Sequence, residues 1–314
     1  MDQTSLAPVI KAAVDGLRSG ELVGLPTETV YGLGADATRA DAVAKIFAAK
    51  GRPHFNPLIS HVANLEAAER LGVFSPLAKK LAKAFWPGPL SLVVPRQPDC
   101  VVCDLACAGL DTIALRVPAH PLMQDVLRAF GKPVAAPSAN VSGRPSPTTA
   151  AHVGEEFGDK LALVLDGGPS MVGIESAVVA VSGDQATLLR LGGLSRDALE
   201  AVAGPLLAPD ASAKAAPASP GMVLRHYAPR APVRLNGLAA EAGEVLIGFG
   251  PSFEAADFNL SPTGDLTEAA AHLFALLRAA DARNPKAIVV APIPETGLGE
   301  AIADRLRRAA EHSC

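Results

Sequence analysis

The chain has few cysteines and no long apolar run. Only four cysteines occur in 314 residues, and three of them, Cys100, Cys103 and Cys107, lie in one stretch, unlike the spaced pairs of a disulfide framework. No apolar span has the length of a membrane-crossing helix, and the first residues lack the basic and apolar regions of a signal peptide. We therefore expect a soluble, cytoplasmic protein without membrane contact.

The sequence also lacks a complete metal-binding pattern. Cys100 and Cys103 have the Cys-x-x-Cys spacing of a zinc half-site, but no second Cys/His pair follows at zinc-finger spacing. The alternative is that these thiols are buried or lie in a loop. We predict no metal site among the protein's own side chains, and the sequence leaves open whether Cys100, Cys103 and Cys107 have any function.

Positive charge is not in excess. The formal net charge is -4, which argues against a protein that coats nucleic acid non-specifically, although a local basic groove stays open. Hydrophobic residues make up 49% and charged residues 19%, so the composition predicts globular cores rather than disorder. At 314 residues, one large and one small domain is the natural expectation.

Several common catalytic motifs are missing. The chain contains no Walker-type phosphate loop, no His-Glu-x-x-His and no Gly-x-Ser-x-Gly, which removes the usual readings as a P-loop enzyme, zinc protease or esterase. Gly32-x-Gly34-x-x-Ala37 formally satisfies a dinucleotide fingerprint, but no acidic residue follows at the ribose-binding distance. We regard that match as weak.

The elements that the sequence does predict alternate between helix and strand. Apolar spacing predicts helices near 7–18, 41–50, 76–85, 120–129 and 148–157, and strands near 22–25, 58–61, 91–94, 112–117, 133–136, 161–165, 177–181 and 186–191. The later strands lack intervening helices, which predicts a mixed sheet. We expect a large α/β domain over 1–203, a linker over 204–229 that is rich in Ala, Pro and Ser, and a small Rossmann-like α/β domain of βαβα type over 230–314.

Polar residues cluster in loops that proline holds rigid. Six segments place hydroxyl, amide or basic groups beside a proline ring: 26–29, 52–57, 86–89, 117–118, 136–140 and 144–148. Loops at strand ends are where α/β sheets form binding sites, and such rigid loops can pre-organise a ligand site. The alternative for any single loop is an ordinary tight turn.

These loops carry the chain's resemblance to a known family. In sequence order they read GLPTETVYGLGADA, KGRPHFNPLISHV, FWPGPLSLVV, LRVPAHP, APSANVSGRPSPT, DGGPSMVGIESAVV and SPGMVLRHYAP. Together they resemble the threonylcarbamoyl-AMP synthases of the YrdC-like superfamily, in the long form with an additional C-terminal domain. The resemblance implies a large twisted YrdC-like sheet domain, and a linker that acts as a lid over the nucleotide.

The resemblance also implies a reaction. Members of the family combine L-threonine, bicarbonate or CO2, and ATP into L-threonylcarbamoyl-AMP and pyrophosphate. A tRNA threonylcarbamoyl-transfer complex then uses the product to modify the adenosine next to the anticodon. Such an enzyme must hold two anions together and stabilise the charge that develops between them. ATP would bring its own Mg²⁺, since that ion tends to keep its waters.

Matching motif positions give the expected site. The L-threonine contacts are Thr29, His61, Arg116, Ala136 and Ser176. The ATP contacts are Lys50, Arg52, Asn56, Thr112, Ser138, Asn140, Ser146, Arg190 and Tyr227, of which Lys50 and Arg52 are also expected to act in catalysis. Glu28 and Glu175 are further acidic residues of these motifs without an assigned role.

Simpler interpretations stand beside this one. Lys50 could only stabilise a helix C-terminus, Arg116 could form a surface ion pair, and His61 could be an ordinary core histidine. A carbamoyl transferase of hydrogenase maturation is disfavoured, because those proteins are longer and carry zinc-finger cysteine pairs. An RNA-binding module without this catalysis, or a weak RNA contact of the enzyme, is the remaining alternative. The net negative charge counts against it.

Overall fold

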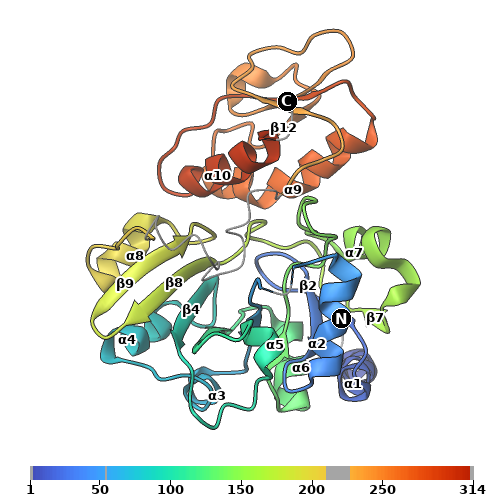
Figure 1. Cartoon of the computed structure of the whole chain (residues 1–314). Helices are drawn as coiled ribbons and strands as arrows, with labels where there is room; N and C mark the ends of the chain where they lie inside the picture. Colours follow the sequence, from blue (N-terminus) through green and yellow to red (C-terminus); the bar gives the residue numbers. More distant parts are fainter. Residues whose placement is uncertain (1–2, 54, 210–226, 312–314) are drawn as a thin grey trace.

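The computed structural model describes residues 3–53, 55–209 and 227–311, and it places two α/β units one above the other (Figure 1). The larger unit contains a nine-stranded sheet and the smaller one a four-stranded sheet. Helices α9 (Leu266–Ala282) and α10 (Gly299–Ala310) lie on the side of the small unit that faces the large one. The predicted α/β class with two sheet domains is confirmed. The predicted linker falls mostly on 210–226, which lie outside the described residues.

The large sheet has the strand order β7-β1-β2-β6-β3-β5-β4-β8-β9 and mixes parallel with antiparallel neighbours, as predicted. Its strands are β1 Val23–Leu25, β2 Gly32–Asp36, β3 Ile59–His61, β4 Leu90–Pro95, β5 Thr112–Arg116, β6 Val134–Ala135, β7 Leu163–Val164, β8 Ala177–Ser182 and β9 Gln185–Arg190. At its centre β3 pairs parallel with β5, in a register that puts His61 beside Arg116. This register brings together two residues that lie far apart in the sequence.

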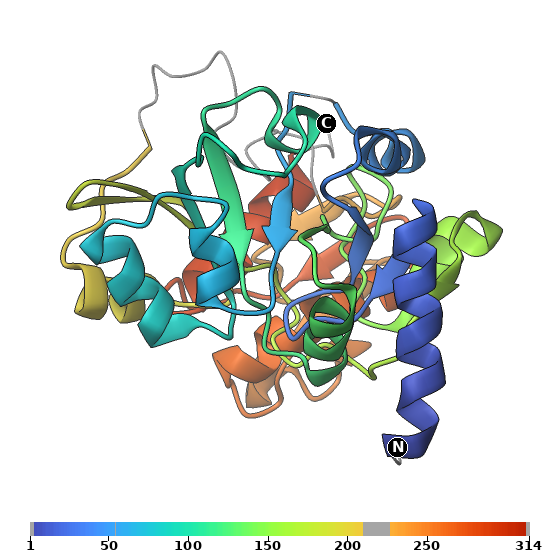
Figure 2. The ribbon, with the colours of Figure 1, turned by 90° about the horizontal axis from the view of Figure 1, so that it is seen from below.

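Helices cover the sheet. They are α1 Gln3–Ser19, α2 Ala40–Lys50, α3 Leu65–Glu69, α4 Pro76–Phe85, α5 Asp104–Cys107, α6 Pro121–Phe130, α7 Ala150–Phe157 and α8 Arg196–Ala203. The sequence spacing predicts all of them except α3, α5 and α8, of which α3 and α5 are too short to show a period. Val14 and Leu17 of α1 pack with Val126 and Phe130 of α6, and Figure 2 shows these two helices side by side. The main core lies beneath α2 and α4.

Strand alternation separates this core from the face that carries polar groups. In β5, Ile113 and Leu115 point into the main core, whereas Thr112, Ala114 and Arg116 lie on the opposite face. A short apolar row of Ile59, Val93, Ala114 and Val178 runs across that opposite face. The polar side chains at the strand ends therefore project from a rigid, well-packed layer.

The glycine-rich segment forms a strand that the sequence analysis did not predict. Gly32–Asp36 is the fully buried β2, paired antiparallel with β1 and β6. A Cβ atom on Gly34 would lie 2.4 Å from Cδ1 of Leu25, so glycine is needed for close packing. The glycines of the apparent dinucleotide fingerprint therefore serve the sheet, which agrees with setting that motif aside.

The small unit has more strands than predicted. Its sheet has the order β10-β13-β11-β12 and is parallel throughout, with strands β10 Val233–Leu235, β11 Val245–Gly248, β12 Phe258–Asn259 and β13 Ile288–Val290. The predicted βαβα unit is wrong because β10 and β12 were missed. These edge strands have three and two residues, which is too short for a periodic pattern to appear.

The two units share one apolar core. Val30 and Ile174 of the large unit pack in the same buried cluster as Tyr227, Phe274 and Leu277. Polar contacts surround this core: Arg278 Nη2 donates to Glu156 Oε1 at 2.8 Å, and Arg196 Nε lies 3.4 Å from Glu300 Oε2. The interface thus combines buried apolar packing with ion pairs at several points.

Gly173 lets the two units approach closely, which leads to a stability prediction. Its φ is +74°, and a Cβ there would lie 2.4 Å from the backbone oxygen of Ala270 in α9. We expect Gly173→Ala to lower the free energy of unfolding by about 2–3 kcal/mol, from backbone strain plus overpacking. The measurement is urea unfolding followed by circular dichroism. Gly183→Ala is the control, because Gly183 also has positive φ but its Cβ would contact nothing. Equal losses in the two variants would contradict the argument.

Candidate active site

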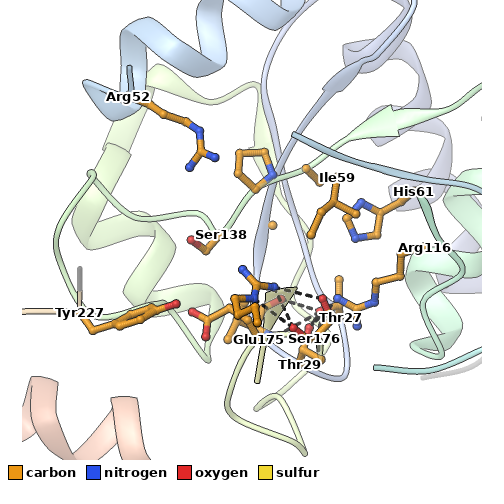
Figure 3. A pocket seen from close by; sticks show the side chains of 15 residues that line it. Thr27, Thr29, Arg52, Ile59, His61, Arg116, Ser138, Glu175, Ser176 and Tyr227 are labelled. Carbon is orange, nitrogen blue, oxygen red and sulfur yellow. Dashed lines mark hydrogen bonds between the residues drawn. The ribbon is translucent and has the colours of Figure 1, made fainter. Parts of the chain in front are cut away.

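A pocket opens at the ends of the central strands and reaches the boundary with the small unit (Figure 3). The residues that line it are Thr27, Thr29, Val30, Gly32, Arg52, Ile59, His61, Arg116, Ala136, Pro137, Ser138, Glu175, Ser176, Arg190 and Tyr227. Figure 3 shows His61 and Arg116 on one side of the pocket and Tyr227 on the other. We call the side with His61 and Arg116 the first half of the pocket, and the side with Tyr227 the second half.

A turn centred on the Thr27 hydroxyl fixes the position of Thr29 in the first half of the pocket. Thr27 Oγ1 donates to the backbone oxygen of Val30 at 2.6 Å and accepts from the backbone nitrogens of Thr29 and Val30 at 3.2 and 3.3 Å. The Thr27 and Thr29 hydroxyls lie 2.8 Å apart, and Ser170 Oγ donates to the Thr27 carbonyl at 3.0 Å. This network fixes Thr29, so its side chain needs no reordering when a ligand arrives.

Arg116 is the central cation of this half. Its Nη1 donates to Thr29 Oγ1 at 2.9 Å, its Nη2 to Glu28 Oε1 at 2.7 Å and its Nε to the Gly88 carbonyl at 3.2 Å. The Arg116 and Glu28 side chains are only 5% and 12% exposed, so the alternative of a surface ion pair is wrong. Burial alone would raise the pKa of Glu28, but the charge and hydrogen bonds of Arg116 outweigh it and lower that pKa.

Two donors of Arg116 stay available for a ligand. A guanidinium carries five N–H groups, and the described residues engage one on each nitrogen. One N–H therefore remains on Nη1 and one on Nη2, so the guanidinium still has two donors that can bind a carboxylate. The other predicted threonine contacts, Thr29, His61, Ala136 and Ser176, also line this pocket.

His61 is buried and uncharged. Burial, followed by the nearby Arg116 charge, lowers its pKa to about 3. Its Nδ1 is buried and has no hydrogen-bond partner among the described residues, as expected for a side chain that awaits a polar ligand. The interpretation as an ordinary satisfied core histidine therefore fails for this nitrogen.

The low pKa of His61 predicts a pH-dependent stability. Between about pH 6.5 and about pH 3 the unfolded chain binds a proton on this residue that the folded chain does not, so stability falls with falling pH by about 1.4 kcal/mol per unit. We expect wild-type protein to lose about 1 kcal/mol more than His61→Gln in urea unfolding between about pH 7 and about pH 5.5. This window lies above the range in which Glu28 takes up its proton. Equal losses would show that His61 takes up its proton in the folded chain.

The second half of the pocket collects buried cations. Arg52 and Arg190 both line it, and burial and the charge of Arg190 lower the pKa of Arg52 to about 10, which leaves it charged at neutral pH. Arg52 donates to the carbonyls of Asn56 and Pro57, and Arg190 to that of Ser176. Neighbouring buried cations repel each other, so this arrangement favours an anionic ligand that relieves the repulsion.

Lys50 supports this half from behind. Its side chain is buried, and its Nζ donates to the carbonyls of Ser138 and Asn140 rather than to carbonyls of its own helix end. Burial and the Arg52 charge hold its pKa well below its ordinary value. The ammonium therefore shapes the loop that presents Ser138 to the pocket, and the helix-end interpretation does not describe its contacts.

The predicted nucleotide contacts separate into two groups. Arg52, Ser138, Arg190 and Tyr227 line the pocket, whereas Lys50, Asn56, Thr112, Asn140 and Ser146 do not. Asn140 and Ser146 lie close behind the wall, because Asn140 bonds to Lys50 and Ser146 Oγ donates to Glu175. Thr112 lies four residues before Arg116 on the same face of β5, about 13 Å away along the strand.

Some pocket residues were not predicted from the sequence. Thr27 and Ile59 lie within the quoted motifs, so their neighbours could have indicated them. Glu175 was noted without a role and proves to line the wall. Arg305 of α10 contacts Glu175 from the small unit, and no sequence signal distinguished it from the surface arginines of the same helix.

Neither a metal cluster nor a membrane span is found in the described parts of the chain. Within residues 3–53, 55–209 and 227–311 no three His, Cys, Asp or Glu side chains group as metal ligands. No helix in those ranges is both long and apolar enough to cross a bilayer. Cys107 is buried, and this burial raises its thiol pKa to about 11, which makes it unreactive.

Comparisons with known proteins cover both units of the chain. A family model described as "Telomere recombination" (Sua5, YciO and YrdC) matches residues 15–192, and one described as "Threonylcarbamoyl-AMP synthase, C-terminal domain" matches residues 194–311. The chain is 42% identical to the threonylcarbamoyl-AMP synthase of Bacillus subtilis and 42% identical to that of Pyrococcus abyssi, covering 96% of this chain and 93% of the relative in both cases. The crystal structure of P. abyssi Sua5 complexed with L-threonine superposes with a TM-score of 0.88 at 40% identity, over 97% of this chain and 94% of that one.

Proposed function

The chain belongs to the threonylcarbamoyl-AMP synthase family, and on that basis we propose that it forms L-threonylcarbamoyl-AMP and pyrophosphate from L-threonine, bicarbonate or CO2, and ATP. The observation that carries the proposal is the two-part pocket. Arg116 and Thr29 can grip an amino acid at one side, and the cations Arg52 and Arg190 face an anion at the other. This is the arrangement that joining two anionic reactants needs.

The proposed chemistry makes positioning the main task of the site. The neutral threonine amine adds to CO2 to form a carbamate and releases one proton to solvent. A carbamate oxygen then attacks the α-phosphorus of ATP, its P–O bond to the leaving group breaks and pyrophosphate leaves. No proton has to be removed at the attack step, so neither Glu28 nor Glu175 is required as a general base there. Arg116 would hold the threonine carboxylate, and Arg52 would stabilise the charge that develops on the transferring phosphoryl group.

Mg²⁺ fits this scheme as a companion of the nucleotide. The only acidic side chain among the described lining residues is Glu175, and it is already bonded to Ser146 and Arg305. ATP would therefore bring the ion on its phosphates, where it neutralises charge and keeps most of its waters.

The product determines the partners that we propose. An acyl adenylate is reactive, so it has to pass to a transfer complex that modifies the adenosine next to the tRNA anticodon. We place the protein in the cytoplasm, where ATP and tRNA occur. A weak contact of the enzyme with RNA belongs to the same proposal.

The test is pyrophosphate release by the purified protein with ATP and Mg²⁺. We expect release only when L-threonine and bicarbonate are both present, together with threonylcarbamoyl-AMP detected by mass spectrometry. Release that needs neither compound would overturn the proposed function. Absence of release together with tight binding of tRNA would favour the RNA-binding alternative.

A further inference from the structure

Arg305 stands out among the buried residues of the small unit. It is the largest fully buried side chain among the described residues, with an exposed fraction of 0%, and it carries a charge. A buried cation must be paired, and here the partner lies in the other unit: Arg305 Nε donates to Glu175 Oε2 at 3.2 Å. Arg305 Nη1 also donates to Asp304 at 3.1 Å.

Glu175 connects this arginine to the pocket. Its carboxylate lines the pocket wall, and its second oxygen accepts a hydrogen bond from the Ser146 hydroxyl. Tyr227 lines the same wall, as Figure 3 shows, and the Arg305 guanidinium lies 5.6 Å from the centre of its ring. Arg305 therefore contacts two wall residues from behind although it does not line the pocket itself.

The position of Tyr227 also depends on the small unit. Its ring stacks on Phe274 of α9 at 5.3 Å between centroids, and its φ of 69° is unusual for a residue other than glycine. A side chain held in this backbone region needs surrounding contacts that fix it. Arg305 and Phe274 supply two of those contacts, both from the C-terminal helices.

Charge explains why this arginine matters for the pocket. The proposed substrates are anions, and Glu175 is the one acidic side chain in the described wall, so its negative charge opposes ATP unless cations offset it. Arg305, bonded to its far side, offsets that charge without occupying the pocket, in addition to the nearby charges of Arg190 and Lys50. The net effect of Tyr227, Glu175 and Asp304 raises the pKa of Arg305 although burial lowers it, so the cation persists.

We propose that Arg305 is a positioning residue for the nucleotide half of the active site: it neutralises Glu175 and seats Tyr227, and so keeps the wall that faces ATP favourable to an anion. The inference deepens the proposed function and rests on it. The simpler interpretation is that Arg305 only fastens the two units together. Its Nη2 has no hydrogen-bond partner among the described residues, which costs stability in either interpretation, so kinetics must separate the two.

The experiment measures binding and turnover separately. Binding of α,β-methylene-ATP, which cannot release pyrophosphate, is measured by calorimetry, and the KM values for ATP and threonine are measured by pyrophosphate release. We expect Arg305→Met to raise the dissociation constant and the KM for ATP about tenfold or more, with a change below about threefold in the KM for threonine. Arg305→Lys restores the charge, so we expect it to recover most of the ATP affinity.

A double variant separates charge neutralisation from fastening. In the Glu175→Gln background there is no carboxylate to neutralise, so any remaining effect of Arg305→Met on ATP binding measures the contact with Tyr227 alone. We expect that effect to be below about threefold, because charge neutralisation is the larger part of the role. Glu300→Gln is the matched control, because it removes another ion pair between the units from the same helix but away from the pocket. We expect wild-type kinetics for it.

Three results would overturn the inference. They are an equal effect of Arg305→Met in both backgrounds, a loss in Glu300→Gln as large as in Arg305→Met, and KM values for ATP and threonine that rise together. If Arg305→Met does not fold, Arg305→Gln, which is uncharged but can still donate hydrogen bonds, replaces it in both backgrounds. An ATP affinity equal to that of the matching background in each case would refute the role. Failure of wild-type turnover would refute the proposed function, whereas the analogue-binding measurements would still decide about Arg305.

Discussion

Replacing Arg116 by alanine is expected to abolish threonine-dependent pyrophosphate release, with a loss of about 10³-fold in kcat/KM for threonine. The guanidinium presents two N–H groups to the pocket while its other contacts hold it against Thr29 and Glu28. Alanine removes both the charge and the paired geometry. The measurement is steady-state pyrophosphate release with threonine varied at saturating ATP.

Arg116→Ala would also leave the buried Glu28 carboxylate without its ion-pair partner. Losing one member of a buried ion pair costs about 3–5 kcal/mol of stability, so Arg116→Ala combined with Glu28→Gln is the better-folded form in which to measure activity. Arg128→Ala is the matched control, because Arg128 is an exposed arginine paired with Asp125 on α6. Substantial threonine-dependent turnover in the double variant would show that the amino acid binds elsewhere.

Replacing Arg52 by alanine is expected to lower kcat about 10²- to 10³-fold and to weaken ATP binding. Arg52 stays charged at neutral pH with a pKa of about 10, and backbone carbonyls at Asn56 and Pro57 hold its guanidinium against the pocket. Such a fixed cation can stabilise charge that develops on the phosphoryl group without having to reorganise. Pyrophosphate release with ATP varied, together with circular dichroism to verify folding, measures the effect.

Lys45→Ala supplies the control for Arg52. Lys45 lies on the preceding helix α2 and forms an exposed ion pair with Glu21, so its loss removes a positive charge without touching the pocket. We expect kinetics close to wild type for it. Wild-type values of kcat and KM in Arg52→Ala would place the nucleotide outside this half of the pocket.

The residues of the pocket half that we propose for threonine were expected from motif positions of the resemblance, and strand geometry accounts for where the structure places them. His61 and Arg116 end adjacent parallel strands, and alternation puts both on the face away from the main core. The position of Thr29 is set by a short turn that begins at a proline and is closed by hydrogen bonds between near neighbours in the sequence. A local pattern thus places Thr29, whereas pairing of strands that lie far apart in the sequence brings His61 and Arg116 together.

The nucleotide half was less predictable because it depends on contacts between distant segments. Lys50 looked like a helix-end cation, yet its ammonium bonds to carbonyls about ninety residues later in the chain. Thr112 was expected at the nucleotide but lies outside the described pocket. Its place on the same strand face as Arg116 could be predicted, whereas the extent of the pocket along that strand could not.

The short elements of the small unit and the role of Arg305 had no sequence signal at all. Strands of two or three residues are too short to show a periodic pattern. An arginine that is one of several on an amphipathic helix is predicted to be a surface residue. Only the packing of α10 against the large unit shows that this one is buried. Tertiary contact decides such cases.

The shared core between the two units has a consequence for the newly made protein. The strands of the large sheet all come from residues before 191, so this domain can fold while the rest of the chain is still being synthesised. Tyr227 and Arg305 come later, so the part of the wall that Tyr227 lines lacks its Arg305 contact until α10 has been translated and has docked. We therefore expect nascent chains and truncated translation products to bind ATP poorly, so that the reactive adenylate is made only by finished molecules.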